Sequence, residues 1–151
     1  MTLSRGRQPV HAYVAEVVGS GRCGIGVLFV DDRGHVLGRI RKTLLHAGRD
    51  QAVFHGILAA LWAARRLGTR ALAVHVDHPR IVAQINGEQE VAWDLVGPYL
   101  QVRALLHAFR DSRVEADLLG WGPAAIAVAE AALRRAGDEV DDLPLWARPV
   151  H

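Results

Sequence analysis

The sequence predicts an α/β domain in which a mixed five-stranded sheet carries helices on both faces. Two observations and the composition indicate this class. The N-terminal third reads as strands joined by tight turns, and the segments after it alternate short apolar strands with helices. Of the 151 residues, 50% are hydrophobic and 23% charged, which is a globular balance. Meander strands pair antiparallel and strands separated by helices pair in parallel, so the sheet is mixed.

The meander occupies the N-terminal third. Residues 10–18 are almost wholly apolar and end in Gly19-Ser20-Gly21, where the chain can turn sharply. A second β-prone run begins at Gly24 and ends at the turn sequence of residues 31–34, after which residues 35–45 are again β-prone. Three antiparallel strands are therefore expected.

Helices and strands alternate after the meander. Asp50 is a candidate N-cap, because its carboxylate can accept from free amides of a first helical turn, and Gly68 follows Leu67 as a stop. Residues 71–76 form an apolar strand of the kind found in sheets covered on both faces. The remaining elements are expected as helices at residues 80–85, 100–109 and 124–136 and a last strand at residues 114–119.

The chain is expected to form one domain at residues 10–136, between an arm at residues 1–9 and an extended tail at residues 137–151. Its single cysteine, Cys23, excludes an intramolecular disulfide and fits a reducing cytoplasm. No segment reads as a signal peptide or reaches the ~20 apolar residues of a membrane span.

Charge favours a polyanionic partner. The formal net charge is +2, the basic side chains are nearly all arginine, and the acidic ones partly concentrate in the tail. The domain without its acidic tail is more basic, so it could bind the phosphate backbone of a nucleic acid. Arginines that are merely solvated at the surface would give the same composition.

Three segments resemble type-one ribonuclease H-like (reverse-transcriptase-like) domains. Residues 24–38 are similar to the second and third strands of this family, and residues 50–61, which begin Asp-Gln-Ala-Val-Phe-His-Gly, are similar to its first helix. The segment Val74-His-Val-Asp-His-Pro-Arg-Ile-Val-Ala-Gln-Ile-Asn-Gly87 is similar to its Asp-Ser-x-x-Val-x-x-Gln-x-x-Asn-Gly stretch. The order and separations match over residues 10–133, so the resemblance implies a ribonuclease H-like fold.

Two residues stand at metal-binding positions of that family. Its members cut the RNA strand of an RNA–DNA hybrid with two divalent cations, magnesium or manganese, held by four carboxylates. The resemblance puts Asp77 at the third position and, if the first loop is short, Glu16 at the first. Asp77 as a helix cap and Glu16 as a solvent-facing strand end are the alternatives. A glutamate for an aspartate moves the oxygens by about 1.5 Å, which matters to a cation that demands ligands at ~2.0–2.1 Å.

The two other positions indicate a degenerate active site. Val53 replaces the glutamate of the first helix and cannot bind a metal; Val53→Glu is expected to raise metal affinity. The fourth position falls on Glu130, with Ile126 where an asparagine is often found, although an exposed helix glutamate would read the same way. We expect Glu16 and Asp77 to meet at the ends of adjacent strands, with Val53 facing them.

Three functions stay open. The first is an impaired ribonuclease H-like domain that binds an RNA–DNA hybrid or double-stranded RNA, with Arg39, Arg41 and Lys42 facing phosphates at the sheet edge. The second is a metal-dependent ribonuclease H that uses a reduced catalytic set of carboxylates, with magnesium or manganese. The third is a protein-interaction module that offers tryptophan anchors and the acidic tail as a partner-binding or self-docking strand. A homodimer is left open, and no membrane partner is expected. The reduced set is Glu16, Asp77 and Glu130, and the tryptophans are Trp62, Trp93, Trp121 and Trp146.

Overall fold

The computed structural model describes residues 9–134 and 139–141, so the N-terminal arm and most of the tail, with Trp146, lie outside the described residues. None of the described helices is long and apolar enough to cross a membrane. The elements are β1 (Val10–Val18), β2 (Arg22–Val30), β3 (Val36–Leu45), α1 (Arg49–Arg66), β4 (Ala71–Val76), α2 (Pro79–Ile85), the 3-10 turn η1 (Trp93–Leu95), α3 (Val96–Leu106), β5 (Asp111–Glu115), α4 (Gly122–Arg134) and β6 (Glu139–Asp141).

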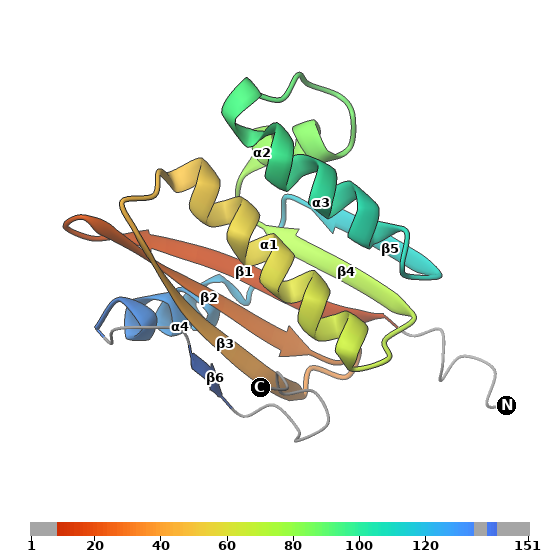
Figure 1. Cartoon of the computed structure of the whole chain (residues 1–151). Helices are drawn as coiled ribbons and strands as arrows, with labels where there is room; N and C mark the ends of the chain where they lie inside the picture. The colour runs from red at the N-terminus through yellow and green to blue at the C-terminus, as the bar shows by residue number, and fades with distance from the viewer. Residues whose placement is uncertain (1–8, 135–138, 142–151) are drawn as a thin grey trace, which may run out of the picture.

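The strands form one sheet in the order β5-β4-β1-β2-β3-β6, with α1 on one face and α4 on the other (Figure 1). The first three strands are antiparallel, whereas β1 pairs in parallel with β4, and β4 with β5. The predicted mixed sheet with helices on both faces is confirmed. Because β1 and β4 are parallel neighbours, their carboxyl ends meet at one edge, where α/β sheets commonly bind ligands.

The face under α1 is packed with large side chains. This helix lies on β1, β2 and β4 and also contacts α3. Phe54, Ile57 and Leu61 recur at helical spacing on its buried side, and all three are fully buried together with Ile25 and Phe29 of β2. This core holds the first turn of α1 against the carboxyl end of β1.

The face under α4 is built on glycine. A Cβ atom placed on Gly24 would overlap the carbonyl oxygen of Ala129, and one on Gly26 would overlap the Ala129 amide and the Ala125 carbonyl at 2.7 Å. The backbone of α4 therefore lies directly on β2, which only residues without a side chain permit. This close approach fixes where the start of α4 reaches the sheet.

Several predicted boundaries are wrong, and the helix expected at residues 100–109 lies at Val96–Leu106. Gly48, not Asp50, is the N-cap of α1, and the Asp50 carboxylate contacts His78 and Arg80 at the start of α2 instead. The last of the five expected strands lies at Asp111–Glu115 instead of residues 114–119. Its ladder with β4 runs from Ala71 to His75, and beyond it the chain turns through Leu119, which has a φ of 50°.

Part of the acidic tail adds a sixth strand. β6 pairs antiparallel with β3, with Asp141 opposite Arg39 and Glu139 opposite Arg41. The tail thus contributes a self-docking strand, one of the alternatives that the sequence left open. It also covers β3 at residues 39–41, so the prediction that Arg39 and Arg41 lie at an open sheet edge is wrong, whereas the ladder does not reach Lys42.

Candidate carboxylate site

A pocket of about 100 Å³ opens at the carboxyl ends of β1 and β4. Pairing of Val14 with Val76 brings the two strand ends level, and the start of α4 closes the pocket from the other face. Glu16 and Asp77 both line it, so the predicted meeting of these two carboxylates is confirmed. Their role as metal ligands stays a prediction. The lining residues are Val14, Ala15, Glu16, Asp77, Leu118 and Ile126.

Glu16 is a shielded carboxylate with a cation beside it. Its side chain is 16% exposed, so it does not face solvent as the alternative reading required. Burial raises the pKa of Glu16, and the nearby charge of Asp77 acts in the same direction. Arg49 and His78 oppose this rise in pKa, and Arg49 Nε lies 3.4 Å from a Glu16 carboxylate oxygen.

A second set of polar side chains joins the segment after Asp77 to the start of α1. Asp50 in the first turn of α1 accepts a hydrogen bond from Arg80 at 2.5 Å and lies 3.2 Å from His78 Nε2. His78 is the N-cap of α2, so Asp77 is not the helix cap that the alternative reading made it. These contacts tie the start of α1 to the start of α2 and leave Asp77 exposed.

The other two expected positions do not supply carboxylates. Val53 is fully buried in the core under α1 and does not line the pocket, so it does not face the site as predicted. Glu130 is exposed and outside the pocket, and Ile126, one helical turn earlier, lines it instead. The proposed helix register was therefore wrong by four residues.

The pocket does not fit a pair of divalent cations. Within the described residues, no group of three or more histidine, cysteine, aspartate or glutamate side chains is placed to hold a metal ion. Two cations held close together need several anionic ligands between and around them. Glu16 and Asp77 alone, with Arg49 beside them, do not provide this.

The predicted phosphate-facing residues do not share one surface. Arg39 and Arg41 line a separate cavity of about 360 Å³ between β3 and α4, together with Trp121. Lys42 follows Arg41 in an extended strand and so points to the opposite face of the sheet. Only the two arginines can contact one ligand at this cavity.

Sequence reasoning missed a buried ring stack on the α4 side of the sheet. The rings of His11 and His75 lie 5.1 Å apart, that of Tyr13 lies 4.7 Å from His75, and Trp121 stacks on Tyr13. His75 Nδ1 donates to the carbonyl of Asp117, so a neutral His75 accepts from His11 Nδ1 at 2.9 Å. Burial lowers the pKa of His75, and His11 contributes to this. The sequence offered one indication of this stack: His11 and His75 each interrupt an apolar strand, and these two strands, β1 and β4, pair in parallel.

Comparisons with known proteins agree with the fold. The family model described as reverse transcriptase-like matches residues 13–131. The bifunctional protein Rv2228c of Mycobacterium tuberculosis is 32% identical over 107 residues, which cover 70% of this chain but only 28% of that protein. The chain therefore corresponds to well under half of this relative's length.

Solved ribonucleases H superpose over most of the chain. Ribonuclease H1 of Halobacterium salinarum has a TM-score of 0.77 at 25% identity and covers 83% of this chain and 98% of its own. The N-terminal ribonuclease H domain of rv2228c has a TM-score of 0.74 at 24% identity, covering 82% and 97%. LC11 ribonuclease H1, solved with an RNA/DNA hybrid, has a TM-score of 0.75 at 16% identity, covering 84% and 98%. The ribonuclease H-like fold is confirmed.

Proposed function

The chain belongs to the reverse transcriptase-like family, and from this premise we propose that it binds nucleic acid, as an RNA–DNA hybrid or double-stranded RNA, with little or no cleavage. One observation carries the proposal. Where the family resemblance implies four carboxylates, Glu16 and Asp77 line the pocket, while Val53 is buried and Ile126 takes the fourth place. LC11 ribonuclease H1, a relative in fold, is solved with an RNA/DNA hybrid.

Two exposed arginines beside the pocket support binding to phosphates without metal ions. The side chain of Arg49 is 62% exposed and that of Arg80 is 58% exposed, so both can meet phosphate oxygens while keeping their carboxylate partners. Such contacts release counterions from the nucleic acid, so affinity should fall as salt rises. A duplex would then bind across the mouth of the pocket without being held for cleavage.

A metal-dependent ribonuclease H is the second candidate. It is favoured by the adjacent carboxylates Glu16 and Asp77, which could share one magnesium or manganese ion if Arg49 moved away. Glu130 cannot take part from its observed position. A protein-interaction module is the third candidate, supported by Trp93, which is 89% exposed.

Gel shifts and a cleavage assay run side by side distinguish these candidates. Hybrid, duplex RNA and duplex DNA are tested at two salt concentrations, with EDTA or with manganese. We expect salt-sensitive binding of hybrid or duplex RNA in EDTA and no cleavage in manganese, with Asp77→Asn binding at least as tightly as the natural chain because it removes a negative charge. Robust cleavage that Asp77→Asn abolishes would establish the enzyme. Absence of both binding and cleavage would leave the interaction module.

We also propose a cytoplasmic location. Cys23 is buried, its Sγ donates to the carbonyl of Ala47 at 3.3 Å, and burial raises the pKa of its thiol. Such a thiol is unreactive and suits a reducing compartment. Neither this location nor the binding proposed here requires a homodimer.

A further inference from the structure

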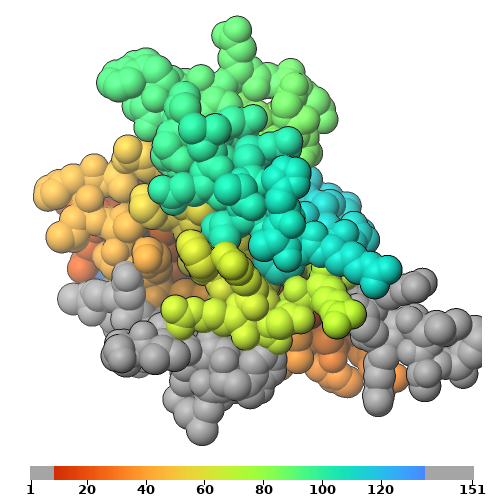
Figure 2. Space-filling view, turned by 45° about the vertical axis from the view of Figure 1, so that its right-hand side comes forward, coloured from red at the N-terminus to blue at the C-terminus, as the bar shows by residue number. Residues whose placement is uncertain are grey.

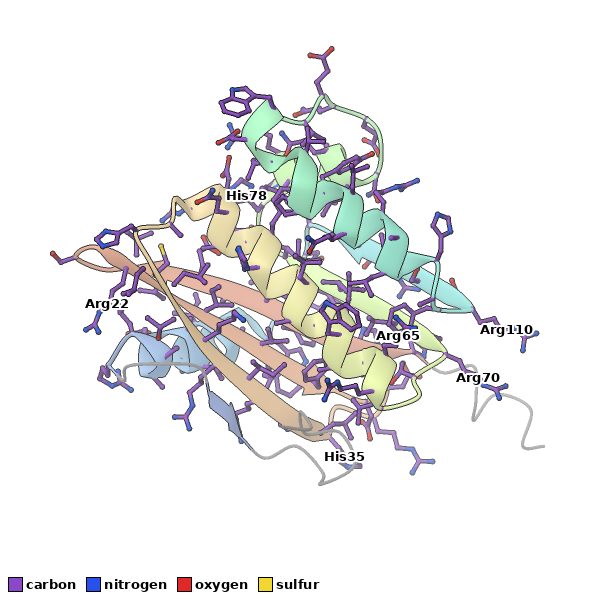
Figure 3. The ribbon with its side chains drawn as sticks, viewed as in Figure 1. Arg22, His35, Arg65, Arg70, His78 and Arg110 are labelled. Carbon is purple, nitrogen blue, oxygen red and sulfur yellow. The ribbon has the colours of Figure 1, made fainter. Side chains whose placement is uncertain are left out.

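Arginines gather at the end of the sheet opposite the carboxylates, where β4 and β5 begin. The ladder pairs Ala71 with Asp111, and the Asp111 amide donates to the carbonyl of Arg70 at 3.1 Å. Arg70 comes just before β4 and Arg110 just before β5. The two residues therefore lie on adjacent segments of the backbone, about 5 Å apart. Both are exposed, and Figure 3 shows them at the same end of the molecule.

The last turn of α1 brings two more arginines and a tryptophan to this end. Arg65 and Arg66 are exposed, and the guanidinium of Arg65 lies over the Trp62 ring at 5.6 Å from its centre. The Trp62 side chain is itself 49% exposed. Figure 2 shows this part of α1 (yellow-green) adjoining the turn between α3 and β5 (cyan), so the two groups form one surface.

The charge of this surface is not balanced within the described part of the chain. Asp111 is the one acidic residue in residues 62–70 and 107–111, and its amide, not its carboxylate, makes the contact with Arg70. Arg65, Arg66, Arg70 and Arg110 form no ion pair with any described residue. An exposed and unbalanced group of guanidinium ions attracts polyanions.

We propose that Trp62, Arg65, Arg66, Arg70 and Arg110 form a binding surface for single-stranded nucleic acid. A base stacks on the exposed indole or on the guanidinium plane over it, and the flanking arginines hold the phosphates on either side. Paired bases hide their faces inside the duplex, so an aromatic platform beside cations favours single strands. β4 separates this surface from the carboxylate pocket by six residues, or about 20 Å. The inference does not depend on the duplex binding proposed above.

Fluorescence anisotropy of labelled 15-nucleotide oligo(dT) and oligo(U) tests this surface with matched pairs of variants. Trp62→Ala should weaken binding by roughly 5- to 150-fold, whereas Trp93→Ala, which removes a more exposed tryptophan, should leave it unchanged. Arg70→Ala/Arg110→Ala should reduce the slope of log affinity against log salt by about 1.4, from about 0.7 for each lost phosphate contact. Arg22→Ala/Arg134→Ala removes the same charge elsewhere and should leave the slope unchanged. Circular dichroism confirms that each variant folds.

Each outcome bears on the surface directly. Equal affinities and slopes for the two arginine doubles would overturn the inference, and so would failure of the natural chain to bind either oligonucleotide. Displacement by polyglutamate with no effect of Trp62→Ala would assign the surface to acidic polypeptide instead. Oligonucleotide binding through this surface without binding of hybrid or duplex RNA would support it while contradicting the duplex-binding function.

Discussion

The two ends of β4 differ in whether their arginines form ion pairs. At its carboxyl end, Arg49 pairs with Glu16, and Arg80 of α2 pairs with Asp50 at the start of α1. At its amino end, Arg70 and Arg110 have no acidic partner among the described residues. Paired arginines attract a phosphate mainly on direct contact, whereas an unpaired group of arginines attracts a polyanion over a Debye length. The end of β4 at which the family resemblance implies metal ligands is thus not the end with unpaired charge.

Substitution of Val53 should have the largest effect at the carboxyl end. Because Val53 is fully buried and does not line the pocket, Val53→Glu would put a carboxylate into the core instead of restoring a metal ligand. We expect a loss of about 3–5 kcal/mol in the free energy of unfolding at pH 7, measured by urea denaturation. Val53→Gln, of the same size without the charge, is the control, and the two should converge in acid. If Val53→Glu were as stable as the control and bound manganese, the side chain would reach the pocket.

A carboxylate at position 126 should turn the pocket at the carboxyl end of β4 into a cation site. Ile126 lines the pocket beside Glu16 and Asp77 and is 42% exposed, so Ile126→Asp adds a third carboxylate at little cost in burial. We expect manganese affinity to rise by roughly tenfold, or about 1.4 kcal/mol, by titration calorimetry. Ala127→Asp, on the neighbouring part of α4 that lines the other cavity, is the control. Equal affinities of the two variants would show that position 126 contributes no ligand.

The smallest expected effect is a pH-dependent gain at Glu16. Burial raises its pKa above the ordinary value of 4.5, so the folded chain holds the proton more tightly than the unfolded chain. Stability is therefore lost as pH rises from the ordinary value through the raised one. Glu16→Gln removes this loss. At pH 7 its free energy of unfolding should exceed that of the natural chain by up to about 1 kcal/mol, and at pH 4 the two free energies should be equal. A larger gain at pH 4 than at pH 7 would mean that the carboxylate is stabilised in the fold.

Much of the fold was predictable because local patterns agree with the final packing. Each local pattern is compatible with only one kind of secondary structure. Examples are the glycine turns, the apolar strand at residues 71–76 and the helical spacing of the first helix. β5 was misplaced because it carries a single buried residue, Val114, and its ladder with β4, not its own pattern, defines it. β6 is three residues long, and only its pairing with β3 makes it a strand.

The candidate site was predictable where strand pairing determines it. Glu16 and Asp77 follow apolar strands that pair in parallel, so their meeting needs only the sheet order. Glu130 was misassigned because an alanine-rich helix has no sequence feature that separates one turn from the next. The pairing of Asp50 with Arg80 joins side chains 30 residues apart, and no local rule connects them.

The position of β6 also affects the order of events during synthesis. Its partner strand β3 ends at Leu45, and β6 is complete only at Asp141. At ~5–20 residues per second, a ribosome adds the intervening segment in roughly 5–20 s. For that time the nascent chain presents the hydrogen-bonding edge of β3 without its final neighbour. A chaperone or another nascent chain that pairs with strand edges has its opportunity then, and loses it when the acidic strand emerges.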